Sequence, residues 1–165
     1  MTKQILIFTT ALVLTGCQSV GTQYISPTPT QPNATFQTRN NVLATSFNEK
    51  GCYSGRTKVP KNEGFLLQPG KEVFMTYEGS WGPSRATYPA DGGFCRVVFS
   101  FVPDEGAHYI FKARYVESTG KRQPAYCTGD LEKSTADTAS EPVAIKFFYL
   151  RQRSLACIRA EPLSE

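Results

Sequence analysis

The 165-residue chain has a single histidine, His108, and no two of its five cysteines are close together in the sequence. Zinc sites are built from closely spaced Cys and His ligands, so the spacing argues against a metal site. One histidine and the lack of a Gly-x-Ser-x-Gly motif also argue against a Ser-His-Asp nucleophile. His108 follows a turn motif at 103–106 and is expected to be an exposed loop residue. No catalytic residue and no cofactor is predicted.

Charge is also sparse, because only 19% of the residues are charged and no basic block occurs. Lys and Arg number 18 against 14 Asp and Glu, which gives a formal charge of +4 spread along the chain. A nucleic-acid binder concentrates its positive charge on one face, so this class is not expected. A glycosidase needs two acids that face one bond across a cleft, whereas Asp104 and Glu105 are neighbours in a turn.

The chain lacks an apolar run long enough to span a bilayer as a helix. Residues 5–14 (ILIFTTALVL) form a ten-residue run that is mostly apolar, and Lys3 precedes it. A helix of that length extends about 15 Å, roughly half of the hydrocarbon core. The run is therefore typical of the hydrophobic region of a signal peptide.

The residues that follow this run are Leu14-Thr15-Gly16-Cys17. They resemble the lipobox of bacterial lipoproteins, which has an aliphatic residue, a small residue, Gly or Ala, and then Cys. The resemblance implies that residues 1–16 are a signal peptide removed before Cys17. It also implies that Cys17 carries a diacylglyceryl thioether and an N-acyl chain, which together give stable membrane anchoring. The alternative is an ordinary secretory signal, or a buried helix, with a cysteine there by chance.

The position after the anchor favours one membrane over the other. Gln18 and Ser19 follow Cys17, and neither is the Asp that resembles an inner-membrane retention signal. In a Gram-negative cell the expected location is therefore the outer membrane, facing the periplasm. Residues 17–46 are rich in Gln, Thr, Ser, Asn and Pro and are predicted to form a disordered tether, followed by a domain over 47–165.

The domain shows strand periodicity and little helical periodicity. Alternating apolar side chains predict strands at 72–78, 143–150 and 155–159, the second of them covered on both faces. The same alternation gives the inward-facing side chains expected at 72–78 and on either side of the turn at 103–106: Val73, Met75, Phe99, Phe101, Tyr109 and Phe111. Residues 95–115 predict a β-hairpin around the turn at 103–106, and residues 133–140 a loop or a short helix. The fold class expected is all-β, a small antiparallel sandwich or barrel of about seven strands.

With Cys17 assigned to lipid, four cysteines remain, and an even number in an exported domain implies two disulfides with three possible connectivities. The pairing favoured is Cys95–Cys127 with Cys52–Cys157. The predicted hairpin returns the chain towards the level of Cys95 before Cys127. The second pair then closes the two ends of the domain.

One aromatic segment stands apart from the predicted strands. Trp81, Arg85 and Tyr88 lie in the Gly- and Pro-containing stretch 77–88 (YEGSWGPSRATY). Trp81 is a candidate for stacking on a sugar ring or docking a partner protein, with Arg85 binding an anion. The alternative is that this segment folds back as a lid over one end of the core.

These features favour a non-enzymatic, lipid-anchored binding or assembly module of the cell envelope. Its overall plan resembles that of small bacterial lipoproteins that serve as accessory subunits of envelope machines or as inhibitors of foreign lysozymes. The partners expected are the membrane, through the acyl chains on Cys17, and an envelope protein or polysaccharide, with no nucleic acid. The alternatives are an envelope hydrolase with unrecognised carboxylates and a purely structural spacer.

Overall fold

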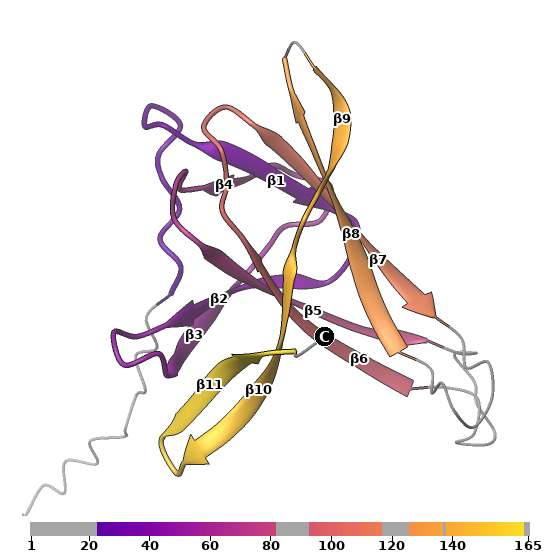
Figure 1. Cartoon of the computed structure of the whole chain (residues 1–165). Helices are drawn as coiled ribbons and strands as arrows, with labels where there is room; N and C mark the ends of the chain where they lie inside the picture. The colour runs from indigo at the N-terminus through magenta and orange to yellow at the C-terminus, as the bar shows by residue number, and fades with distance from the viewer. Residues whose placement is uncertain (1–22, 82–92, 117–125, 137, 164–165) are drawn as a thin grey trace, which may run out of the picture.

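The computed structural model describes residues 23–81, 93–116, 126–136 and 138–163 (Figure 1). The predicted signal peptide 1–16 and the lipidation site Cys17 lie outside the described residues. The described chain forms eleven strands: β1 (Ala34–Thr38), β2 (Val42–Phe47), β3 (Tyr53–Lys58), β4 (Phe65–Leu67), β5 (Val73–Trp81), β6 (Gly93–Phe101), β7 (His108–Val116), β8 (Tyr126–Thr135), β9 (Thr138–Val143), β10 (Lys146–Ser154) and β11 (Cys157–Pro162). In this part of the chain, no helical segment has the length and hydrophobicity needed to cross a bilayer.

The strands form two sheets that pack as an open sandwich (Figure 1). The five-stranded sheet has the order β4-β1-β7-β8-β9, and the six-stranded sheet has the order β11-β10-β6-β5-β2-β3. Neighbouring strands are antiparallel except β1 and β7, which run parallel. The predicted all-β class and the sandwich are thus confirmed, with more strands than the expected seven.

The core lies between the two sheets and is built by alternation along each strand. On β5, Val73 and Met75 are buried, and on β6, Phe99 and Phe101 are buried, as the sequence pattern predicts. The facing side chains of the other sheet include Phe36, Tyr109 and Phe111. Gly129 of β8 leaves room for the ring of Phe111, since a Cβ at this position would collide with that ring.

The tether predicted over 17–46 is wrong for its C-terminal part. Ala34, Phe36, Val42 and Ala44 lie in β1 and β2 and are buried in the core. Tyr24 also packs against the core, and its hydroxyl accepts a hydrogen bond from the backbone N–H of Gln68 at 3.0 Å. In β1 polar residues alternate with the apolar ones, and β2 has only four consecutive buried residues, one of them Thr45. The average composition of the segment therefore concealed both strands. The sandwich therefore begins well before residue 47.

The hairpin predicted over 95–115 is also wrong. Its two strands exist as β6 and β7, but β6 pairs with β5 and β10, whereas β7 pairs with β1 and β8. The turn at 103–106 carries the chain from one sheet to the other, and Gly106 adopts a φ of 72° there. The hydroxyl of Tyr109 accepts a hydrogen bond from the backbone N–H of Asp104 at 2.9 Å, which fixes this crossing.

The strand predicted over 143–150 crosses between the sheets in the same way. Val143 ends β9 in the five-stranded sheet, and Lys146 begins β10 in the other. Val143, Ile145 and Phe147 do pack against the core, as their alternation predicts. Beyond Phe147 the strand leaves the core and Tyr149 is exposed, so the predicted cover on both faces is wrong for this part. Residues 133–140, expected as a loop or short helix, contain the end of β8 and the start of β9.

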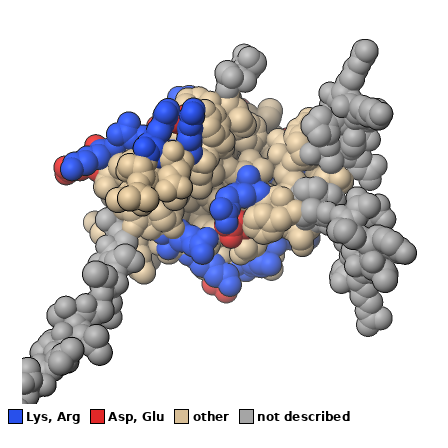
Figure 2. All heavy atoms as spheres, turned by 90° about the horizontal axis from the view of Figure 1, so that it is seen from below, with Lys and Arg blue, Asp and Glu red and all other residues tan. Residues whose placement is uncertain are grey.

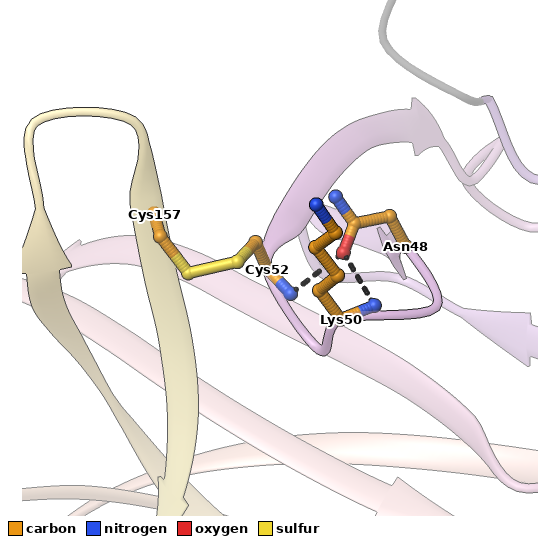
Figure 3. Close-up of a disulfide and its surroundings, with 4 residues drawn as sticks. All are labelled: Asn48, Lys50, Cys52 and Cys157. Carbon is orange, nitrogen blue, oxygen red and sulfur yellow. Dashed lines mark hydrogen bonds between the residues drawn. A yellow bond between two sulfur atoms is a disulfide. The ribbon is translucent and has the colours of Figure 1, made fainter.

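Both predicted disulfides are confirmed. Cys95–Cys127 joins β6 to β8 and so links the two sheets, with a Cα–Cα distance of 5.9 Å. Cys52–Cys157 joins the turn before β3 to the start of β11, with a Cα–Cα distance of 5.0 Å (Figure 3). The Asn48 Oδ1 accepts hydrogen bonds from the backbone N–H groups of Lys50 and Cys52, both at 3.0 Å, which shapes the turn that presents Cys52.

The Cys52–Cys157 bond also shapes the six-stranded sheet. The sheet curls so that β11, at one end of the strand order, lies near β3 at the other end. The hairpin of β10 and β11 projects below the packed strands in Figure 1, and Cys157, just after its turn, is bonded to Cys52. One face of this hairpin turns towards the curled sheet, and the other faces away.

Candidate binding cleft

Two strand edges are left unpaired where β10 departs from the sandwich. β6 pairs with β5 along its whole length, but with β10 only over Val98–Ser100. β8 pairs with β7 from Tyr126 onwards, but with β9 only from Leu131. Among the described residues, the β10 side of 93–97 and the β9 side of 126–130 thus have no strand partner. Cys95–Cys127 ties these two stretches together.

A hollow of about 550 Å³ opens between these stretches, and we call it the β6–β8 cleft. The disulfide and the ends of β6, β8 and β10 surround it. Its lining is Phe94, Cys95, Arg96, Val97, Val98, Tyr126, Cys127, Thr128, Phe147, Phe148, Tyr149, Leu150 and Leu163. The cleft therefore combines aromatic faces with strand backbone.

Large apolar side chains in the lining remain open to solvent. The exposed fractions are 62% for Phe94, 47% for Tyr126, 41% for Tyr149 and 56% for Leu163. Single exposed apolar residues are ordinary on protein surfaces, but several gathered at one concavity mark an interaction site. Aromatic faces can stack on rings or accept apolar side chains, and unpaired strand edges can hydrogen-bond an added extended segment.

Arg96 connects the cleft to a second, smaller hollow on the outer face of the six-stranded sheet. Its guanidinium lies 5.8 Å from the centre of the Phe94 ring, and it forms an ion pair with Glu78 at 3.0 Å. Glu78 also contacts Arg56 at 3.4 Å. The smaller hollow has a volume of about 200 Å³, and the hydroxyl groups of Thr45 and Thr76 share a buried 2.7 Å hydrogen bond beside it. Glu78 thus holds Arg96 in place at the rim of the cleft.

A larger hollow, of about 830 Å³, lies at the end of β1 beside β7, but several of its polar groups already have hydrogen-bond partners within the fold. The Asn40 Oδ1 accepts a hydrogen bond from the backbone N–H of Ala113 at 3.0 Å, and the Thr38 hydroxyl donates to the carbonyl of Phe111 at 3.1 Å. The Gln37 side-chain amide donates to the carbonyl of Asn62 at 3.0 Å. These contacts hold the connection between β1 and β2 in place, so the β6–β8 cleft is the better candidate.

Most of the binding residues predicted from the sequence lie outside the part of the chain that the structure describes. Arg85 and Tyr88 lie outside the described residues, and for Trp81 only the backbone is described, at the end of β5 opposite Gly93. That pairing places residue 81 at the same end of the sheet as Phe94. Sequence reasoning missed Phe94 and Tyr126, although a signal existed: each directly precedes a half-cystine, so the predicted Cys95–Cys127 bond brings both to one place.

His108, Asp104 and Glu141 are residue types that can act in catalysis or bind metals, but here each contacts another side chain of the fold. His108 begins β7 and is half-buried, with its Nδ1 2.6 Å from the Thr35 hydroxyl, so the expectation of an exposed loop residue is wrong. Asp104 and Glu141 both contact Lys133, at 3.2 and 2.9 Å. Within the described ranges, no three His, Cys, Asp or Glu side chains come together as a metal site.

No protein-family model matches the chain, and no curated protein or solved structure is significantly similar to it.

The stability of the protein should depend on pH through Glu161, which lies beside Tyr149 at the rim of the cleft. The Tyr149 hydroxyl donates to its carboxylate at 2.6 Å, and this bond, with the charges of Arg153 and Arg151, lowers the pKa of Glu161. The stabilisation from a lowered carboxyl pKa is complete above the unfolded value of about 4.3 and is lost as the pH falls. We expect the urea midpoint to drop between about pH 6 and about pH 3, and to drop less in Glu161→Gln.

The matched control for this experiment is Glu105→Gln, which removes an exposed carboxylate from the connection between β6 and β7. It should keep the full acid sensitivity of the parent protein. Equal acid sensitivity in the parent and in Glu161→Gln would contradict the prediction.

Proposed function

We propose that this chain is a lipid-anchored lipoprotein of the bacterial cell envelope whose sandwich acts as a non-enzymatic binding or assembly module. The acyl chains on Cys17 hold it to the outer membrane, on the periplasmic side, and the β6–β8 cleft contacts the partner. The observation that carries the proposal is the gathering of exposed Phe94, Tyr126, Tyr149 and Leu163 around two unpaired strand edges.

The disulfides support the export step of this proposal. Cys52–Cys157 and Cys95–Cys127 account for all cysteines of the described domain and leave Cys17 as the remaining one. Disulfides persist in oxidising compartments such as the periplasm and are rare in the cytosol. This division of the cysteines is what a lipidated, exported domain requires.

The partner class proposed is an envelope protein or polysaccharide. A protein segment in extended conformation could add as a strand to 93–97 or 126–130, with its side chains against Phe94 and Tyr126. A polysaccharide would instead use the aromatic faces for stacking, with Arg96 at the rim. Both uses place Phe94 at the contact.

The experiment places a photoreactive phenylalanine analogue at position 94 of the full chain in the producing cell. We expect irradiation to give one defined crosslinked species in the envelope fraction. Because Tyr126 lines the same cleft, Tyr126→Ala should reduce the yield severalfold. Polysaccharide-digesting enzymes and proteases then distinguish the two partner classes.

The control places the same analogue at position 102, where Val102 is also exposed at 52% but lies outside the cleft. This position should give no such species. Equal crosslinking from positions 94 and 102 would contradict the proposal that the β6–β8 cleft contacts the partner. A crosslinking yield that Tyr126→Ala leaves unchanged would contradict it as well. An Asp or Glu whose replacement abolishes peptidoglycan turnover by a folded protein would favour the hydrolase instead.

A further inference from the structure

The outward face of the β10–β11 hairpin carries more positive charge than its own contacts neutralise. In this hairpin Arg151 lies directly opposite Arg159, and Tyr149 lies opposite Glu161. Because side chains alternate along strands, these four residues share the face that turns away from the sheet. Arg153 lies at a register shift between Gln152 and Ser154, and its ion pair with Glu161 places its guanidinium on the same face. Phe148, Leu150 and Ile158 belong to the other face, and the latter two line the small hollow.

Three guanidinium groups share this face with a single carboxylate, and that carboxylate pairs with only two of them. Glu161 contacts Arg151 at 3.5 Å and also pairs with Arg153. Within the described part of the chain, Arg159 has no carboxylate partner. Like charges directly opposite each other in a ladder are destabilising. The face is therefore set up to gain from an external anion placed between Arg151 and Arg159.

The turn of the hairpin adds an apolar tip to this cationic face. Leu155 is fully exposed, at 101%, in the turn between β10 and β11. Cys157 lies two residues after Leu155 and is bonded to Cys52, so the turn is held in place rather than free to fold back (Figure 3). The neighbouring turn before Cys52 contributes Glu49 and Lys50, whose charges offset each other.

The hairpin is also accessible from outside the sandwich. Its turn lies at the lower edge of Figure 1, away from the packed sheets. Figure 2 shows the molecule from below, where Lys and Arg side chains form several groups, each with a smaller area of acidic side chains beside it. Arg151 and Arg153 keep about half of their side-chain surface exposed, at 56% and 49%.

We propose that this hairpin docks on an anionic lipid surface, with Arg151, Arg153 and Arg159 at the phosphate groups and Leu155 inserted at the interface. Charge complementarity and the apolar tip favour a membrane, because cationic residues near anionic lipids and a buried apolar side chain contribute to binding together. The proposal is independent of the acyl chains on Cys17. In the anchored protein it would orient the domain.

The test measures flotation of the full chain carrying Cys17→Ala, which has no acyl chain and keeps both disulfides. The vesicles are phosphatidylcholine alone, or equal parts of phosphatidylcholine and phosphatidylglycerol. Any binding by residues 5–14 is common to all variants. We expect stronger partition onto the anionic vesicles, weakened by salt, and a loss of roughly 10- to 30-fold in Arg151→Gln/Arg159→Gln.

The matched control is Lys61→Gln/Lys71→Gln, which removes the same charge from exposed positions outside the hairpin. It should keep most of the anionic preference. Leu155→Ser provides a second variant with unchanged charge and should reduce partition severalfold. Free-thiol titration and circular dichroism verify that each variant has folded.

Three results would overturn the proposal. The first is equal flotation with neutral and anionic vesicles. The second is an equal loss in the arginine and lysine double variants, which would make the effect one of net charge. The third is binding of a soluble polyanion without binding to anionic vesicles, which would assign the face to a polymer.

Discussion

Replacing both Cys52 and Cys157 by alanine is expected to lower the free energy of unfolding by about 4 to 5 kcal/mol. The two residues are 105 positions apart, so the bond closes most of the described domain into one loop. A crosslink of this length removes more entropy from the unfolded chain than a short one. Urea denaturation of the oxidised double variant and its parent measures the difference.

The second disulfide gives a matched comparison. Cys95 and Cys127 are 32 positions apart, and the same chain-entropy relation gives about 3.7 kcal/mol for a loop of this size. The loss of unfolding free energy in Cys95→Ala/Cys127→Ala should therefore be about 1 kcal/mol smaller than the loss in Cys52→Ala/Cys157→Ala. A larger loss from this pair than from Cys52→Ala/Cys157→Ala would contradict the entropic account.

Local structure should respond differently in the two double variants. Cys157 fixes the turn of the β10–β11 hairpin to the turn before β3, so its loss should increase hydrogen exchange in β11. Cys95 and Cys127 border the β6–β8 cleft, so their loss should increase exchange at 93–97 and 126–130. The proposed crosslinking at position 94 should then depend on the second bond far more than on the first.

The sequence predicted which side chains face inwards more reliably than which strands are neighbours. Alternation of apolar residues placed Met75, Phe99 and Phe111 in the core, and all three are buried. Alternation is a local property of each strand and contains no information about its partner. The hairpin at 95–115 was therefore wrong in its pairing, although the inward faces of β6 and β7 were right.

The disulfides were predicted correctly from a chain path that was partly wrong. Cys95 and Cys127 meet because β6 and β8 face each other across the core, not because β6 and β7 form a hairpin. Two different paths bring these residues together, so the pairing did not depend on the error. Both paths also bring Phe94 and Tyr126, each next to a half-cystine, to the same end of the sandwich.

The cleft itself could not be predicted from the sequence. It exists because β10 leaves β6 after Phe148 and because β9 joins β8 only from Leu131 onwards. Both limits are set by where the chain crosses between the sheets, which is a property of tertiary structure. The start of the domain was missed for a related reason, since Phe36 and Val42 gain their buried surface only when distant strands cover them.

Phe111→Ala is expected to lower the free energy of unfolding by about 4 kcal/mol, within the 3 to 5 kcal/mol typical of buried phenylalanines. The ring is 1% exposed and stacks on Phe99 of the opposite sheet, with 4.5 Å between ring centres. Phe36 and Tyr77 lie at 6.4 and 6.2 Å from it, so its removal leaves a cavity bordered by rings from both sheets. Urea denaturation measures the loss.

Phe94→Ala is the matched control, because it removes the same side chain from a position that is 62% exposed on β6. It should change the free energy of unfolding by less than about 0.5 kcal/mol, as is usual for surface substitutions. A stability loss from Phe94→Ala comparable to that from Phe111→Ala would mean that the ring is covered in solution. The exposed aromatic surface on which the β6–β8 cleft depends would then not exist. A stable Phe94→Ala variant that no longer binds its envelope partner would instead separate the residue used for contact from the residues that hold the two sheets together.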